Sequence, residues 1–189
     1  MMNENTPKKD ENTDIPIILR LASMLLDHVF MSLIMVVIIV PFALIALQNE
    51  GNLDTVPPSL LYAMAFGYVL YFFKDAVQGR SFAKRILKFQ VVDNTTGEVA
   101  SPIKCVLRNL LIPLWFFEII PALFNTNRRL GDYLAGTKLV PYNPQKHQST
   151  LDWAQLGIAF LLAIAISSCL LSAMNQILSD MLANLPPVE

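Results

Sequence analysis

The feature that most constrains this chain is a long apolar stretch near its start, roughly Ile15 to Leu47. Its second part, Val29 to Leu47, is almost wholly apolar and has about the length that a helix needs to cross the hydrocarbon core of a bilayer. Arg20, Ser23 and Asp27 in its opening turns share one face of a helix. An acid at the edge of hydrocarbon is costly unless it is neutralised, hydrated or paired. The sequence therefore predicts a membrane helix whose Asp27 needs a partner elsewhere in the chain.

Further apolar blocks indicate a multi-pass membrane protein. Hydrophobic residues make up 54% of the 189 residues, and they come in blocks rather than evenly. Leu60–Phe73 is short, but Pro58 near its start and Lys74 at its end allow it to span. Trp153 opens a final apolar helix that runs to about Leu178. We therefore expect a mainly α fold with three to four membrane helices.

The apolar run from Val106 to Phe124 differs from the others. Two prolines interrupt it, and it carries Arg108 and Glu118, so it is a poor lipid-exposed span. All 14 lysines and arginines lie outside the link Gln48–Ser59 and the tail after Leu178. If this run stays on one side of the membrane, every basic residue is cytoplasmic, as is the N-terminus. We favour three spans with this broken run packed on the cytoplasmic side, and four spans are the alternative.

The polar segments on either side of that run predict a small β-containing cap. Phe89–Asp93 mixes β-branched and aromatic residues with charges and leads into a turn, and Thr137–Val140 is a second candidate strand. We expect these two strands to pair on the cytoplasmic side. The predicted organisation is a disordered tail (residues 1–14), a main membrane domain (15–145) and an additional C-terminal membrane helix with its tail (146–189).

Two acids within apolar stretches are candidates for an ion pathway. Asp27 is either a structural anchor paired with a basic residue or a proton or ion site. Glu118 lies nearly three turns of helix from Arg108, so it needs a cation on another element or serves as a second acid of a cation pathway. His28 follows Asp27 but points about 100° away on a helix, which favours a separate, satisfied histidine.

A compact motif follows the broken run: Arg128-Arg129-Leu130-Gly131-Asp132, then Ala135-Gly136-Thr137. Gly131 and Gly136 allow backbone turns that other residues make only at a cost. Asp132 can cap the start of a helix or accept hydrogen bonds from arginine. The simplest alternative is a loop that turns a helix into a strand.

The charged residues of these segments predict a buried ionic cluster at the cytoplasmic edge of the membrane. Arg20, Asp27 and Asp132 would form it, and Arg108 or Arg129 would complete the charge balance. Removing one partner from such a cluster strands a charge and destabilises the fold.

In the order of its motifs the chain resembles the RDD family of bacterial membrane proteins. The motifs are the Arg20/Asp27 helix, Gly79-Arg80-Ser81-Phe82-Ala83-Lys84-Arg85-Ile86-Leu87 before Val91-Val92-Asp93, Leu107-Arg108-Asn109, and Leu130-Gly131-Asp132-x-x-Ala135-Gly136-Thr137. The resemblance covers about Ile15 to Tyr142 and leaves the last helix outside.

The resemblance implies the identity of the family's name-giving residues, one arginine and two aspartates, which here would be Arg20, Asp27 and Asp132. Ala83 stands where members often have glycine. Transport of unidentified ligands has been suggested for the family, and the resemblance implies a place in the bacterial inner membrane.

No enzyme signature competes with this interpretation. The chain has two histidines and lacks a phosphate-binding glycine loop, a histidine metal motif and a nucleophile elbow. Cys105 and Cys169 lack metal-ligand spacing. A net charge of −1 without a basic, aromatic-interleaved surface does not point to nucleic acid. We expect no catalytic residues, cofactor or metal.

Two functional hypotheses follow. In the first, the protein transports a small solute or ion, with Asp27 and Glu118 as titrating acids. In the second, it is a non-catalytic scaffold or regulatory subunit of a larger membrane complex. The chain has few spans and no inverted repeat, so a conduit would need several copies or other membrane proteins.

Overall fold

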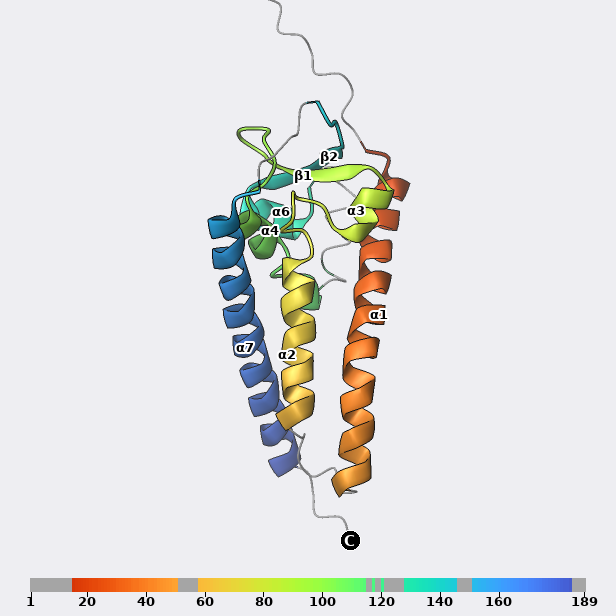
Figure 1. The fold of residues 1–189 in the computed structure, drawn as a ribbon, viewed down its shortest axis with the longest axis vertical. Coiled ribbons are helices and arrows are strands. Elements are labelled where there is room, and N and C mark those ends of the chain that lie inside the picture. The colour runs from red at the N-terminus through yellow and green to blue at the C-terminus, as the bar shows by residue number, and fades with distance from the viewer. Residues whose placement is uncertain are drawn as a thin grey trace, which may run out of the picture.

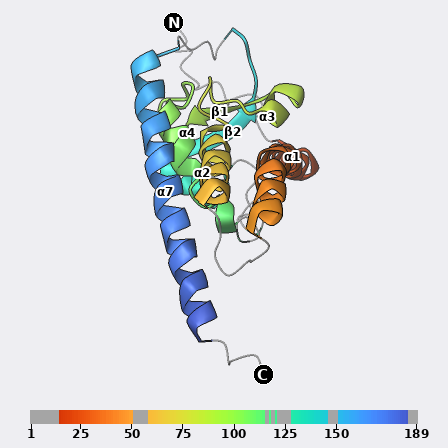
Figure 2. The same cartoon turned by 60° about the horizontal axis from the view of Figure 1, so that its bottom comes forward.

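The computed structural model describes residues 15–50, 58–114, 117, 120, 128–145 and 151–184. Three long helices run side by side with a group of short elements at one end (Figure 1). The long helices are α1 (Ile17–Glu50), α2 (Pro58–Phe73) and α7 (Trp153–Ala183). Two views place α2 between α1 and α7 (Figures 1 and 2). The mainly helical fold predicted from the sequence is confirmed.

Two of the described helices are long and apolar enough to cross a membrane. These stretches are Ile17–Ile45 of α1 and Trp153–Met181 of α7. In their most apolar windows only 6% and 22% of the residues are buried, so most side chains face outward, as they would toward lipid. At 16 residues α2 is shorter than the roughly 20 that a span needs. Three spans therefore stay a prediction.

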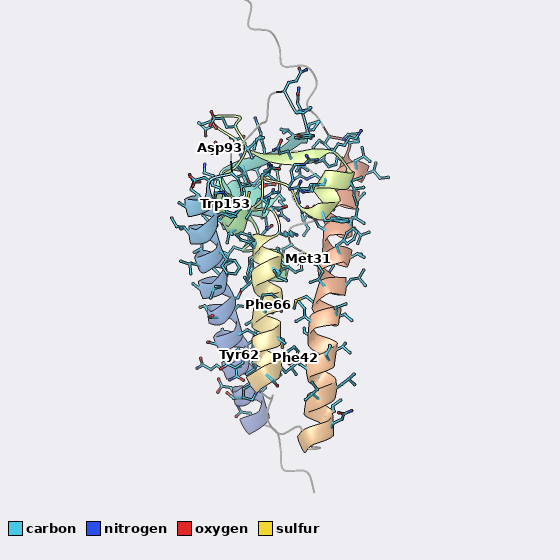
Figure 3. The ribbon with its side chains drawn as sticks, viewed as in Figure 1. Met31, Phe42, Tyr62, Phe66, Asp93 and Trp153 are labelled. Carbon is cyan, nitrogen blue, oxygen red and sulfur yellow. The ribbon has the colours of Figure 1, made fainter. Side chains whose placement is uncertain are left out.

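Aromatic side chains lie at both ends of the long helices (Figure 3). Trp153 is 74% exposed at the start of α7, close to the short elements, where tryptophan commonly lies at a membrane interface (Figure 3). Phe42, Tyr62 and Phe66 lie farther down the long helices (Figure 3). A membrane interface at the level of Trp153 would place the short elements at or beyond one membrane surface.

The short elements form what we call the cap. They are α3 (Phe82–Ile86), β1 (Phe89–Asp93), α4 (Pro102–Arg108), the 3-10 helix η1 (Ile112–Leu114), α6 (Leu130–Ala135) and β2 (Thr137–Pro141). Strands β1 and β2 pair antiparallel with Val91 opposite Leu139, which confirms the predicted pairing. Gly136 ends α6 in the left-handed conformation with φ of 64°, so the chain can turn directly into β2.

The predicted broken run begins within a short helix. Ser101 caps α4 by accepting a hydrogen bond from the Lys104 amide, and Pro102 occupies the first turn. The helix ends at Arg108, and η1 follows. Glu118 lies outside the described residues, so its predicted role is not addressed by the structure.

Two apolar clusters hold the cap to the helices. Under the sheet, Val91 and Leu139 pack with Ile15 and Cys105. A second cluster lies where α2, α4 and α7 meet, with Val106 at its centre. Its other buried members are Val69, Phe72, Ala159 and Ala163. The position of the cap over the helix ends is thus fixed by packing as well as by charge.

The backbone of Gly79 lies close to strand β1, so a substitution at Gly79 tests the position of that strand. Its φ is 65°, and an added Cβ would lie 2.6 Å from the carbonyl oxygen of Val91. Gly97 has a similar φ of 73° but no atom within 4 Å of its Cβ position. Both glycines therefore carry the same conformational cost of substitution, and only Gly79 carries the clash.

We predict that Gly79→Ala destabilises the protein more than Gly97→Ala does. The left-handed conformation alone costs about 1–2 kcal/mol for a residue other than glycine, and the Val91 contact adds to it. Thermal unfolding of the detergent-purified variants measures the difference. Equal losses in the two variants would show that Gly79 does not approach β1 as described.

Candidate functional site: a buried ionic cluster under the cap

Eight charged side chains meet where the cap rests on the helix ends. They come from α1, from the turn after α2, and from α3, α4 and α6, and all are largely shielded from solvent. We call them the ionic cluster. Its carboxylates are Asp27, Asp75 and Asp132, and its cations are Arg20, Lys74, Lys84, Arg108 and Arg129.

Asp132 is the most heavily bonded carboxylate. Arg108 Nη2 lies 2.9 Å from Oδ1, and Arg20 Nη2 lies 3.4 Å from Oδ2. The Arg129 amide donates to Oδ2 at 3.0 Å and the Thr137 hydroxyl to Oδ1 at 2.8 Å. Burial acts to raise the pKa of Asp132, but Arg108 and Arg129 outweigh it and hold this pKa below its usual value. Asp132 is therefore ionised and ties α6 to α1, α4 and β2.

Asp27 is held by lysines of the cap and of the turn after α2. Lys84 Nζ lies 2.5 Å and Lys74 Nζ 3.8 Å from its Oδ2. Lys84 also reaches Asp75 Oδ1 at 2.9 Å and donates to Ser81 Oγ at 3.1 Å. Ser81 is the N-cap of α3 and accepts a hydrogen bond from the Lys84 amide. Lys84 therefore lies in the first turn of α3, and its side chain faces the cluster. Lys84 thus links α1 to α3 and to the end of α2.

Asp75 and Asn109 complete the connection between the two ends of the cluster. Asn109 Nδ2 donates to the Phe72 carbonyl at 3.1 Å and to Asp75 Oδ2 at 3.4 Å. Its Oδ1 accepts from Arg129 Nη2 at 2.7 Å. Arg108 Nη1 lies 3.7 Å from Asp75 Oδ2, so Arg108 bridges Asp75 and Asp132. The cluster is therefore one continuous network.

The neighbouring charges shift the pKa values of two further described members of the cluster, Asp75 and Lys74. Burial acts to raise the pKa of Asp75, but Lys84 and Arg108 outweigh it and hold this pKa well below its usual value. Burial and the neighbouring Lys84 lower the pKa of Lys74 to about 8, against the pull of Asp27, so Lys74 is still mostly charged at pH 7. Among the described residues the cluster thus holds three ionised carboxylates and five basic side chains.

Three cavities adjoin the cluster in the described part of the chain, and one of them, of about 290 Å³, has Asp27 and Lys74 in its lining. The small cavity, of about 30 Å³, is lined by cluster residues together with Ser23, Met24 and Leu139. The large cavity, of about 470 Å³, lies against α1 and is mostly apolar. Met24, Lys74 and Arg129 belong to the walls of both. The cluster therefore has an apolar neighbour large enough for a small ligand.

His28 and Tyr71 form a second polar feature of the large cavity. His28 Nδ1 and the Tyr71 hydroxyl lie 2.7 Å apart, within hydrogen-bonding distance. Lys74 Nζ lies 4.7 Å from the centre of the Tyr71 ring, an arrangement that favours a cation. His28 thus links α1 to Tyr71 of α2.

The structure brings together five residues selected from the sequence: Arg20, Asp27, Arg108, Arg129 and Asp132. Gly131 is buried in α6, and Gly136 ends that helix. Sequence reasoning missed Lys74, Asp75 and Lys84 as members of the cluster. A charged pair directly after the apolar α2 was the available signal for Lys74 and Asp75. The partner of Asp27 is Lys84, which lies 57 residues away in the chain, and no local sequence pattern predicts that pairing.

We predict that Asp132→Asn strongly destabilises the protein because it strands buried guanidinium groups, a loss of about 3–5 kcal/mol. Asp93→Asn is the matched control, since Asp93 pairs with Lys104, whose side chain is 39% exposed, and such pairs contribute at most about 1 kcal/mol. Unfolding in mixed detergent micelles measures both. Equal effects would mean that Asp132 does not hold the cap.

The same carboxylates give the expected pH dependence. The pKa values of Asp75 and Asp132 are lowered in the folded protein, so the unfolded chain binds protons more readily than the folded one. Their stabilisation is complete above the unfolded pKa of about 4 and is lost as the pH falls below it. Asp132→Asn should weaken this acid dependence.

The sequence was compared with protein-family models, with curated proteins and with solved structures. The RDD family model matches residues 16–184, and no curated protein or solved structure gives a match. The match runs through α7, beyond Tyr142, where the resemblance was expected to end. Family membership and the apolar helices together fit a membrane protein. The chain belongs to the RDD family.

Proposed function

We propose that this RDD family protein is a non-enzymatic membrane transport component that binds an anionic ligand at its ionic cluster. The observation that carries the proposal is a cavity of about 470 Å³ that has the cluster residues Lys74 and Arg129 in its lining. Positively charged side chains at the wall of a cavity favour the approach of a negatively charged ligand.

The contacts of the carboxylates favour an anion over a cation. Asp27 has Lys84 at 2.5 Å and Lys74 at 3.8 Å, and Asp132 accepts from Arg108 and Thr137. A cation that used Asp27 would have to displace Lys84. A cation pathway through Asp27 and Glu118 is therefore the less favoured form of transport.

The arrangement of the long helices favours function within an assembly. Because α2 lies between α1 and α7, the three helices form a row rather than a ring (Figure 2). We propose that further copies or other membrane proteins complete the conduit. Basic side chains on the cap, including Arg85 and Lys88, favour a cytoplasmic cap and N-terminus in a bacterial inner membrane.

The test is charge movement in proteoliposomes on a supported membrane. Jumps of phosphate or acetate at constant cation concentration should move negative charge, and jumps of sodium at constant anion concentration should not. Lys74→Gln should lower the anion signal about tenfold or more, because it removes a charge from the cavity wall. Arg85→Gln removes the same charge from the exposed face of α3 and should leave the signal unchanged.

Two results would contradict the proposal. A sodium signal that Asp27→Asn abolishes would support the acid-based cation pathway. A silent preparation whose intact mass in mild detergent includes unrelated proteins in fixed ratio would support a scaffold subunit, for which the exposed apolar sides of α1 and α7 offer docking surfaces.

A further inference from the structure

The third cavity lies between α1 and α3, where the cap meets the long helix (Figure 1). It has a volume of about 290 Å³, and most of its lining is apolar: Phe30, Met31 and Ile34 of α1 and Phe82 of α3. The Phe30 and Phe82 rings meet edge to face with their centres 4.5 Å apart, so the two helices touch at this cavity. Ile34 is 39% exposed and Phe82 60% exposed. The cavity therefore opens onto the outer face of α1, where the apolar helix would meet lipid.

The buried part of the same cavity is polar. Asp27, Lys74 and Ser81 line it, and Asp27 and Ser81 are only 5% and 3% exposed. The Lys84 ammonium lies against both, at 2.5 Å from Asp27 Oδ2 and 3.1 Å from Ser81 Oγ. Because they contact the same ammonium, the Asp27 carboxylate and the Ser81 hydroxyl lie close enough for one small polar group to reach both.

This polar end keeps one hydrogen-bond donor and one acceptor unused. Ser81 Oγ accepts from the Lys84 ammonium and from the Lys84 amide, and neither of these groups can accept the hydroxyl hydrogen in return. No other described residue accepts that hydrogen. Lys74 and Lys84 both approach Asp27 at Oδ2, and no described residue donates to its Oδ1. Since a buried donor or acceptor without a partner is unfavourable, a ligand that bonds to both groups would be favoured.

We propose that this cavity binds a neutral amphiphile with a hydroxyl head, such as a long-chain alcohol or a monoacylglycerol. The head donates to Asp27 Oδ1 and accepts from the Ser81 hydroxyl, because a hydroxyl group can do both. The first part of the chain lies along Phe30, Met31 and Ile34. Small-molecule sites begin at about 300 Å³, so the cavity holds the head and this part of the chain, and the rest lies against α1 in the bilayer.

The charges around the head position favour a neutral group. A phosphate or carboxylate head would meet the Asp27 carboxylate, and an ammonium head would meet Lys74 and Lys84, and like charges in contact are costly. Among the described lining residues, this cavity shares only Lys74 with the large cavity. The inference therefore does not rest on the proposed function.

Photolabelling of the full chain in phosphatidylcholine nanodiscs tests the proposal. The probes are hexadecanol, its methyl ether and hexadecyl phosphate, each with a diazirine in the chain near the head. Peptide mass spectrometry then measures the labelling of residues 30–34. Hexadecanol should label this segment at least about threefold more than either of the others, because the ether cannot donate a hydrogen bond and the phosphate meets Asp27.

Ser81→Gly tests the polar end. It removes the hydroxyl but keeps a residue that is well tolerated at a helix N-cap, and it should lower hexadecanol labelling about threefold or more, to the level of the ether. Ser101→Gly is the matched control. Ser101 caps α4 in the same way, by accepting from the Lys104 amide, but it is not among the residues that line the cavity. Ser101→Gly should leave the labelling unchanged.

Ile34→Trp tests the apolar end. The larger side chain should narrow the mouth of the cavity and lower the labelling by hexadecanol about threefold or more. Val36→Trp is the control, because Val36 is 55% exposed and lies roughly 200° around α1 from Ile34. It adds the same bulk to the lipid-facing surface and should leave the labelling unchanged.

Three results would overturn the inference. Equal labelling by hexadecanol and its methyl ether would show that Asp27 and Ser81 do not select a hydroxyl. Stronger labelling by hexadecyl phosphate would show that the head is anionic. Labelling that Ile34→Trp does not lower would place the probe on the outside of α1. Thermal unfolding identifies any variant that fails to fold, and the three probes on the unaltered protein then decide. Loss of the anion signal in proteoliposomes would overturn the proposed function without affecting these outcomes.

Discussion

The rest of this structure depends on the pairing of three buried aspartates with five buried cations. Asp27 belongs to the long helix α1, Asp75 to the turn after α2 and Asp132 to a short cap helix, so the ion pairs of these aspartates that the structure describes each join two elements. Each aspartate is costly to bury alone and favourable only when its partners are in place. The cap therefore has to sit on the helix ends in one position, and the network specifies the fold as much as it stabilises it.

The same network gives the site its chemical character. Lys74 and Arg129 belong to the cluster and also line the large cavity, whose other lining is mostly apolar. The apolar wall continues onto the outside of α1, where Ile18 is 75% exposed. Cationic and apolar groups thus meet at one cavity, and this combination links the cluster to the proposed function.

How far the sequence predicts this arrangement depends on the range of each interaction. The length of the apolar runs predicts α1 and α7, and the β-branched and aromatic residues of Phe89–Asp93 predict a strand that does pair with β2. Lys84 could not be assigned to Asp27 because that pair depends on how α3 packs against α1. The sequence also did not predict that α4 ends at Arg108. The next residue, Asn109, donates a hydrogen bond to the carbonyl of Phe72, which lies far away in the chain. Local patterns thus predict elements, and tertiary packing decides which charges meet.

The most direct test of the ionic cluster is a double-mutant cycle on Asp27 and Lys84. Free energies of unfolding in mixed micelles would be measured for Asp27→Asn, Lys84→Met and the double variant. We expect the double variant to be more stable than the sum of the single effects by about 1–3 kcal/mol, because the pair lies 2.5 Å apart. Asp27→Asn combined with Lys104→Met is the control and should be additive. Additivity within about 0.5 kcal/mol for Asp27 and Lys84 would contradict the account, because it would show that the two residues do not interact.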